Sequence, residues 1–242
     1  MLLSAVVSLS HDRLTRLLYH RYPWHQLLST LASSKRLTEG CLIIDDTEID
    51  KSYAQKITGC GWLRSHKQNK YFYGLHVVVL AWTNGKQTLP LAWKVYKKGG
   101  EKTKIDLALE LLGYGLLLLR GKPKAVLFDA FYASERMLKF LTKRGVMFYS
   151  QLPKTRLFNH RQLNTRHQGR PYWADKGIIK GSLEVQVVKH RRKYYVTNNL
   201  GVNQMTVRGD YRLRWKIEEV FRFIKQELGF EQCQDEKFNG AV

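Results

Sequence analysis

The sequence is 242 residues long, enough for one large domain with its own core, and its 44% hydrophobic content argues against a disordered chain. Forty-one Lys and Arg against 20 Asp and Glu leave a formal net charge of +21. Because like charges repel in a compact fold, this excess predicts a polyanionic partner, with nucleic acid favoured over an anionic membrane surface. A basic surface without a specialised partner is the alternative.

Secretion and membrane insertion are both unexpected. Cys41, Cys60 and Cys233 are widely spaced and form no CxxC pair or zinc-like cluster, so neither a disulfide framework nor a zinc site is supported, and a reducing cytoplasm is favoured. The N-terminus lacks the basic and cleavage regions of a signal peptide. The longest apolar run, 107–119, contains Glu110 and is shorter than a membrane span.

The first third of the chain predicts helices, then a strand and a hairpin. Residues 9–35 favour two short helices within a helical segment, 1–39. The apolar run CLIIDDT then predicts a buried strand, with Asp45 near its C-terminal end. Two β-rich runs between 71 and 96 flank Asn84-Gly85, a dipeptide typical of a type I′ turn, and so predict a hairpin.

The middle of the chain alternates helices and strands. A helix is expected over 101–120, a buried strand at KAVLFDA that ends on Asp129, a helix over 133–144 and a strand at VMFYSQL. The order β, β-hairpin, α, β, α, β indicates an α/β sheet. Asp45 and Asp129 stand at the ends of separate strands, so they can converge only if those strands are neighbours.

Residues 154–193 interrupt this pattern. They contain 11 Lys or Arg against only Asp175 and Glu184. SLEVQVVKH and KYYVTNN favour a pair of strands joined through HRR, which indicates a basic β-rich insertion at about 154–200; ordinary solvated loops are the alternative.

A helix over 205–228 carries the most informative pattern. Its apolar residues form one stripe, and Tyr211, Arg214, Glu218 and Lys225 fall along one edge of that stripe. A phenol, a guanidinium, a carboxylate and an ammonium are therefore expected where the core meets solvent. The alternative is an ordinary amphipathic helix with an i,i+4 Arg–Glu pair.

Asp45, Asp129 and Glu218 together offer the hard oxygen ligands that suit Mg²⁺. Two such ions about 4 Å apart can activate a nucleophile and stabilise the leaving oxygen of a phosphodiester. Asp46 is adjacent to Asp45, and alternate strand residues face opposite sides, so only one of the two is expected to face the metals. His76 could approach the same edge, but a histidine packed in the core or on the surface is favoured.

The run Tyr211-x2-Arg214-x3-Glu218-x6-Lys225 matches the YREK signature and resembles DDE transposases of the insertion-sequence-four group. IIDDT resembles the first-aspartate motif of these enzymes, and its D-x-T pattern selects Asp45. VLFDAFYAS resembles the second-aspartate strand, and 154–193 resembles the β-rich insertion before the glutamate. The resemblance covers about 40–232.

The resemblance implies a ribonuclease H-like domain over 40–242, with a mixed sheet flanked by helices. It further implies two Mg²⁺ ions, with Mn²⁺ as a substitute, held by Asp45, Asp129 and Glu218. The expected partners are double-stranded DNA, as terminal inverted repeats and target, and a second copy of the chain in a synaptic homodimer, at the bacterial nucleoid. DNA contacts are expected at Tyr211, Arg214, Lys225, Arg191, Arg192 and Lys193.

Two departures from that family leave other functions open. Only 44 residues precede Asp45, and the chain stops soon after the glutamate helix, as expected of a truncated element or part of a split reading frame. A truncated DNA-binding relic or regulator, and a related nuclease that cuts without strand transfer, are therefore the alternatives to a transposase.

Overall fold

The computed structural model describes residues 30, 37, 40–52, 57, 59–65, 69–119, 122–179 and 183–227. Apart from Thr30, the helices expected over 9–35 lie outside these residues. The strands are β1 (Cys41–Asp50), β2 (Gly61–Ser65), β3 (Lys70–Thr83), β4 (Thr88–Tyr96), β5 (Val126–Phe128), β6 (Phe148–Leu152), β7 (Leu157–Phe158), β8 (Arg161–Gln162), β9 (Tyr172–Ile179), β10 (Leu183–His190) and β11 (Lys193–Thr197). The helices are α4 (Lys104–Leu118), α5 (Glu135–Lys143), α6 (Gln204–Arg212) and α7 (Lys216–Arg222), with 3-10 turns η1 (Leu163–Thr165) and η2 (Leu213–Trp215) and a π-helical turn η3 (Phe223–Glu227).

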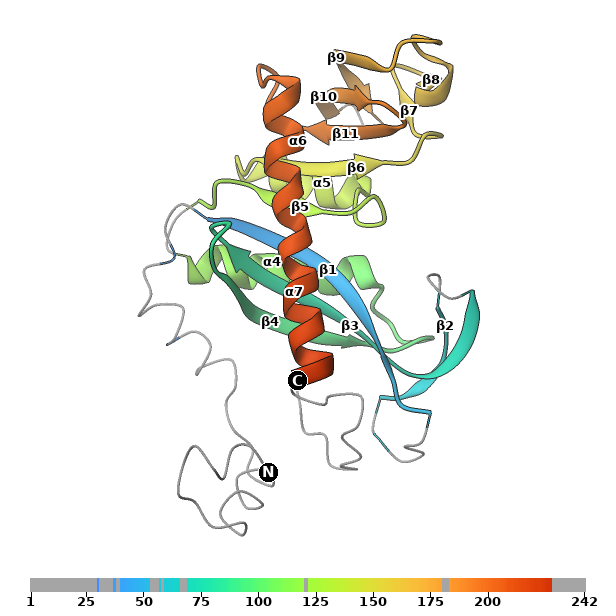
Figure 1. The fold of residues 1–242 in the computed structure, drawn as a ribbon, viewed down its shortest axis with the longest axis vertical. Coiled ribbons are helices and arrows are strands. Elements are labelled where there is room, and N and C mark those ends of the chain that lie inside the picture. Colours follow the sequence, from blue (N-terminus) through green and yellow to red (C-terminus); the bar gives the residue numbers. More distant parts are fainter. Residues whose placement is uncertain are drawn as a thin grey trace.

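All described strands belong to one mixed sheet, which runs through the length of the molecule (Figure 1). Its order is β2-β3-β1-β5-β6-β11-β10-β9-β7-β8, with β4 also paired to β3. β1, β5 and β6 are parallel neighbours, whereas β3 and β11 pair with them antiparallel. The expected α/β architecture, with a mixed sheet between helices, is confirmed.

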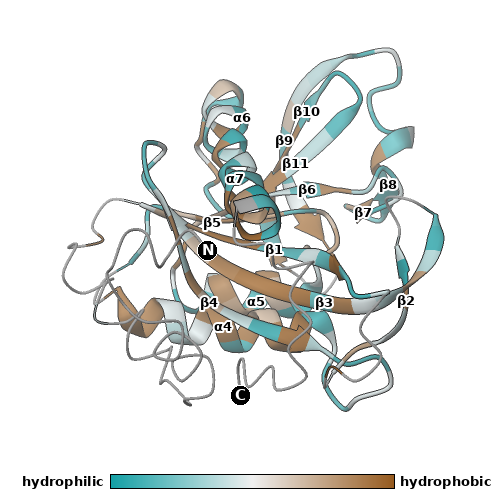
Figure 2. Cartoon of the chain, turned by 60° about the horizontal axis from the view of Figure 1, so that its bottom comes forward, coloured by the Kyte–Doolittle hydropathy of each residue, from teal (hydrophilic) through white to brown (hydrophobic). Residues whose placement is uncertain are grey.

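Each face of the sheet packs against its own helices. Leu42, Ile44 and Phe128 face α4 and α5, and Ile43 and Leu127 face the run from α6 to η3. Because both faces are covered, β1 and β5 begin as continuous apolar runs rather than alternating ones. In Figure 2 the hydrophobic colour accordingly follows β1, β3 and the inner sides of the helices.

The predicted hairpin of β3 and β4 forms, but the turn expected at its tip is wrong. Residues 84–87 join the strands, twice the length of a type I′ loop. The Asn84 side chain accepts hydrogen bonds from the amides of Lys86 and Gln87, and Gly85 has φ of 89°. The asparagine side chain thus stabilises a longer loop.

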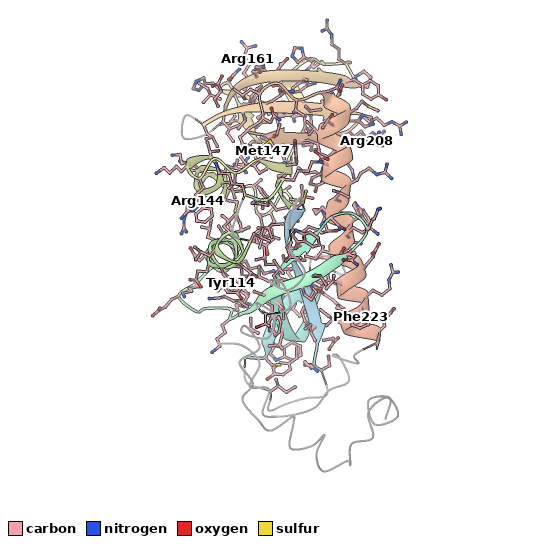
Figure 3. All side chains as sticks on the ribbon, turned by 90° about the vertical axis from the view of Figure 1, so that its left-hand side faces the viewer. Tyr114, Arg144, Met147, Arg161, Arg208 and Phe223 are labelled. Atoms are coloured by element: carbon pink, nitrogen blue, oxygen red, sulfur yellow. The ribbon has the colours of Figure 1, made fainter. Side chains whose placement is uncertain are left out.

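The basic segment after β6 extends the central sheet. β10 and β11 pair antiparallel, as predicted, and β11 then pairs with β6 through Tyr195 and Gln151. The insertion is therefore hydrogen-bonded to the same sheet that holds β1 and β5. The insertion forms one end of the molecule, where Figure 3 labels Arg161.

The last helical region differs from the single α-helix predicted for 205–228. It begins at Gln204 after the N-cap Asn203, tightens into η2 and widens into η3. Residue 228 lies outside the described residues. Figure 3 shows the run as one long column with Arg208 toward one end and Phe223 toward the other. None of the helices in the described part of the chain is long and apolar enough to cross a membrane.

Candidate active site

Asp45 and Asp129 lie side by side where β5 ends. The last pair of β1 and β5 is Ile44 with Phe128, and each aspartate is the residue that follows this pair. The two strands are thus neighbours, as the convergence of the aspartates required. β1, however, continues to Asp50, so the prediction that Asp45 stands at the end of its strand is wrong. Its pairing with β3 supports these extra residues.

Both carboxyl groups are largely shielded from solvent, and this changes their proton affinity. Burial raises the pKa of Asp45 to about 7, with Arg214 opposing the shift and the negative charge of Asp129 adding to it. Burial also raises the pKa of Asp129, although the amides of Phe131 (2.9 Å) and Tyr132 (3.3 Å) donate to its carboxylate. Two adjacent carboxylates in a poorly solvated place favour a bound cation.

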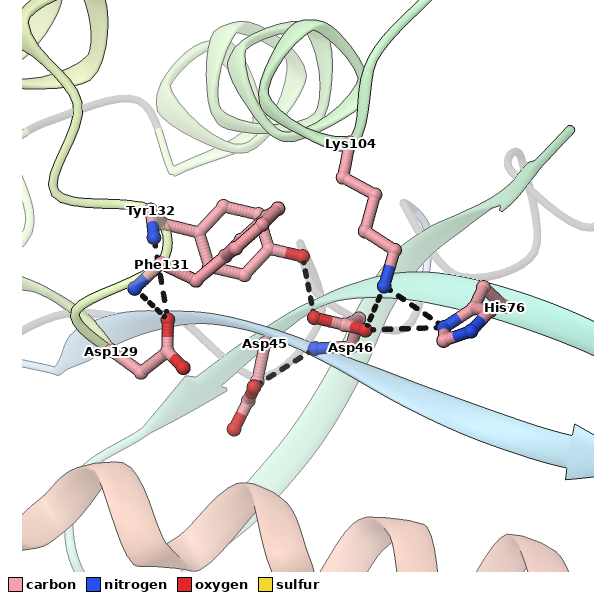
Figure 4. Close-up of polar contacts among 7 residues, drawn as sticks. All are labelled: Asp45, Asp46, His76, Lys104, Asp129, Phe131 and Tyr132. Carbon is pink, nitrogen blue, oxygen red and sulfur yellow. Dashed lines mark hydrogen bonds and ion pairs between the residues drawn. The ribbon is translucent and has the colours of Figure 1, made fainter. Parts of the chain in front are cut away.

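Asp46 points to the opposite face of β1. Figure 4 shows its carboxylate directed toward Lys104 and Tyr132, while Asp45 points toward the helix below the strand. Lys104 Nζ is 2.6 Å from Asp46, the Tyr132 hydroxyl donates at 3.0 Å, and His76 Nδ1 lies 3.5 Å away. Although burial alone raises its pKa, hydrogen bonds from His76, Lys104 and Tyr132 lower the pKa of Asp46 to about 2.

Because Asp45 and Asp46 point to opposite faces of β1, Asp45, and not Asp46, lies beside Asp129. His76 is buried on the Asp46 side of the sheet, with Nδ1 2.9 Å from Lys104 Nζ. The sequence prediction missed Lys104 and Tyr132 as members of this cluster. A lysine in the first turn of a helix opposes the helix dipole, which signals another partner and could have indicated Lys104.

Arg214 connects Asp45 to the third predicted carboxylate. Its Nη1 lies 2.5 Å from Asp45 Oδ2, and its Nη2 lies 3.8 Å from Glu218 Oε1. The Glu218 side chain is 41% exposed, so it does not point into the core. One largely shielded guanidinium therefore lies against carboxylates from β1 and α7, and it provides the positive charge between them.

The donor chemistry of this place suits divalent metal ions. Carboxylate oxygens are the ligands that Mg²⁺ prefers, and Asp45 and Asp129 bring theirs to one strand end. Within the described residues no group of three or more His, Cys, Asp or Glu side chains is gathered as a metal site. Glu218 shares Arg214 with Asp45 and is the candidate that the sequence offers to complete the set.

Tyr211 and Lys225, two other predicted DNA-binding residues, differ in how far they are buried. Tyr211 is only 4% exposed; its ring packs edge-on against Tyr195, and burial raises its pKa to about 12. The Arg214 guanidinium lies 5.8 Å from the centre of the Tyr211 ring, so Tyr211 supports Arg214 from within the core. Lys225 is half-buried in η3.

Three further cations lie where β10 turns into β11, two in the turn and one at the start of β11. Arg191, Arg192 and Lys193 are exposed there. β11 starts beside the C-terminal end of β6, where Tyr194 pairs with Leu152. Because β5 and β6 are parallel, this turn lies at the sheet edge that also carries Asp129.

A mixed sheet covered by helices on both faces, with two aspartates at adjacent strand positions, defines a ribonuclease H-like domain. The chain belongs to the family described as "Transposase DDE domain", whose profile matches residues 36–242. No curated protein shows significant similarity to this sequence.

A solved structure supports this fold. The piggyBac transposase, in a synaptic complex with hairpin DNA, aligns with a TM-score of 0.54 at 11% identity, over 76% of this chain and 40% of the piggyBac chain. This chain thus spans two fifths of that protein. The NurA nuclease from Sulfolobus solfataricus aligns over 80% of this chain and 85% of its own at 11% identity, with a TM-score of 0.35.

Proposed function

We propose that this chain is the catalytic domain of a DNA transposase that cleaves transposon ends and joins them to target DNA. The observation that carries the proposal is the placement of Asp45 beside Asp129, with Arg214 linking Asp45 to Glu218. Family membership supports the same reaction. The proposed group is the insertion-sequence-four transposases, on the strength of the YREK signature.

In this proposal Asp45, Asp129 and Glu218 hold two Mg²⁺ ions, for which Mn²⁺ substitutes. Such ions lower the pKa of the attacking water or hydroxyl and stabilise the leaving oxygen. The residues of the chain orient the carboxylates: Arg214 contacts two of them, and the amides of Phe131 and Tyr132 fix the third.

The proposed DNA contacts follow the same sheet edge. Arg191, Arg192 and Lys193 bind phosphates of double-stranded DNA, and Lys225 and Arg214 hold the cleaved end, with Tyr211 fixing Arg214. A planar guanidinium suits two phosphate oxygens, whereas an ammonium acts as a point charge. The partner in the synapse is a second copy of the chain, and the reaction takes place at the nucleoid.

The test uses the purified chain, Mg²⁺ and DNA fragments from the two flanks of the gene, with a supercoiled plasmid as target. We expect end cleavage and strand transfer from the wild type. Asp129→Asn and Glu218→Gln should abolish both while retaining DNA affinity. Glu219→Gln, a change at an exposed neighbour that pairs with Lys216, is the matched control and should stay active. Cleavage without joining would instead identify a nuclease, and binding without cleavage a DNA-binding relic or regulator.

A further inference from the structure

The hairpin of β2 and β3 exposes aromatic side chains around an arginine. Trp62 is 66% exposed and Tyr71 is 63% exposed. In the register of the two strands Trp62 pairs with Tyr73 and Arg64 with Tyr71, so the four side chains share one face. We call them the aromatic–arginine patch. The Trp62 and Tyr73 rings meet edge-on at 5.8 Å, which holds Trp62 in place.

This patch lies on the face of the sheet that carries Asp45. Asp45 pairs with Val79 on β3, and Tyr73 is six residues from Val79, an even number that preserves the face. At about 3.3 Å per residue the separation along the strand is about 20 Å. β1, β2 and β3 are described throughout, and by this alternation Asp45 is the only carboxylate that they place on this face.

The chemistry of the patch fits a nucleic-acid strand with unpaired bases. Aromatic rings stack on any base, and a nearby cation attracts the phosphates. Arg64 donates to the neutral Asn69 at 3.0 Å, and among the described residues no carboxylate pairs with it. Its charge therefore remains available, in a chain of net charge +21. In duplex DNA the stacked base pairs hide the faces on which Trp62 and Tyr71 could stack.

We propose that the aromatic–arginine patch binds unpaired nucleotides of the DNA strand that runs through the active site. The inference rests on the proposed function, because it takes the strand to be held at Asp45 and Asp129. Because Leu75 and Val77, between Val79 and Tyr73, are buried, the strand has to pass around them. At about 3.4 Å per stacked nucleotide, 20 Å therefore requires at least about six nucleotides between the reacting phosphate and the patch.

Binding by the full chain is measured by fluorescence anisotropy without metal on three probes: an oligothymidylate, a blunt duplex, and the same duplex with single-stranded tails of two to ten nucleotides. Trp62→Ala should raise the Kd for the oligothymidylate and for long tails about tenfold and leave the blunt duplex unchanged. Trp62→Phe should restore most of the affinity. Tails shorter than about six nucleotides should add none.

Leu117→Ala is the control, because Leu117 is 82% exposed on α4, which covers the opposite face of the sheet. An equal loss on the blunt duplex and the tailed probes would overturn the proposal in favour of a duplex contact. No loss with Trp62→Ala or Arg64→Gln would overturn it outright. Neither measurement requires cleavage. A wild type that fails strand transfer but shows the Trp62 effect would therefore refute the proposed function and leave the patch standing.

Discussion

Asp45 and Asp46 are sequence neighbours with opposite electrostatic surroundings. The ammonium of Lys104 and the hydroxyl of Tyr132 hold Asp46 charged, whereas burial beside Asp129 makes the charged form of Asp45 costly. Strand alternation alone predicts that the two residues face different sides. It cannot predict which side each takes, because that depends on helices far away in the sequence.

The raised pKa of Asp45 predicts how stability varies with pH in the absence of divalent metal. Between about pH 4 and pH 7 the folded protein binds the Asp45 proton more tightly than the unfolded chain, so the free energy of unfolding falls as pH rises through this window. Above pH 7 the loss in free energy of unfolding that Asp45 causes is constant, at no more than about 4 kcal/mol. Asp45→Asn removes this dependence, so its Tm relative to wild type should rise from pH 4 to pH 7. Glu219→Gln should show no such trend. The same trend in Glu219→Gln would contradict the attribution of the pH dependence to Asp45.

Tyr132→Phe tests the cluster around Asp46. The change removes the hydroxyl that donates to Asp46 at 3.0 Å but retains the fully buried ring. A half-buried carboxylate that loses a donor is expected to cost about 1 kcal/mol of the free energy of unfolding, the lower end of the range for buried groups. Chemical denaturation should show this loss. Tyr172→Phe, at an exposed tyrosine of β9, should show almost none. Equal stability of the two variants would mean that the hydroxyl contributes nothing.

At the scale of elements, β3 lies close against the backbone of β1 at Gly74. A Cβ there would lie 2.1 Å from the carbonyl oxygen of Ile49, which is backbone and cannot rotate away. Gly74→Ala should therefore lower the free energy of unfolding by about 2 to 3 kcal/mol, or Tm by about 4 to 12 °C. Gly61 pairs directly with Gly74 and has nothing within 4 Å of its Cβ position, so Gly61→Ala is the control. Thermal unfolding of the two variants is the test. A similar Tm for Gly74→Ala and Gly61→Ala would show that β1 can shift away from residue 74 without loss of stability.

The order of most elements could be predicted from hydrophobic pattern and turn residues, because those signals are local. β2 was missed, because its sequence, GWLRS, is short and two of its five residues, Trp62 and Arg64, are exposed. The tightening at η2 was also missed. Its residues have ordinary helical composition, and the ion pair of Arg214 with Asp45, 169 residues away, has no local signal. The adjacency of Asp45 and Asp129 was predictable only as a possibility that the strand order permits.

At the scale of the molecule, the basic turn of the insertion should contribute to DNA affinity through counterion release. Changing Arg191, Arg192 and Lys193 to alanine should make the log–log slope of affinity against salt less steep by up to about 2.7, at about 0.9 for each phosphate that is no longer neutralised. A salt titration on an end duplex measures the slope. Lys143 and Arg144, exposed at the end of α5, are the control pair when changed to alanine. An unchanged slope in the triple variant would mean that this turn does not touch the DNA backbone.

The continuity of β5, β6, β11 and β10 has a consequence for where DNA is cut. These strands are about 4.8 Å apart, so the turn at Arg191 stands about 10 to 14 Å from Asp129 across the sheet, or three to four base pairs of DNA. Interstrand hydrogen bonds make that spacing stiff. If the turn binds the DNA, the cut falls at a fixed distance along the DNA from the phosphates that the turn binds. One base pair inserted between the bound sequence and the natural cut would then move the cut by one nucleotide, whatever bases occupy the new position.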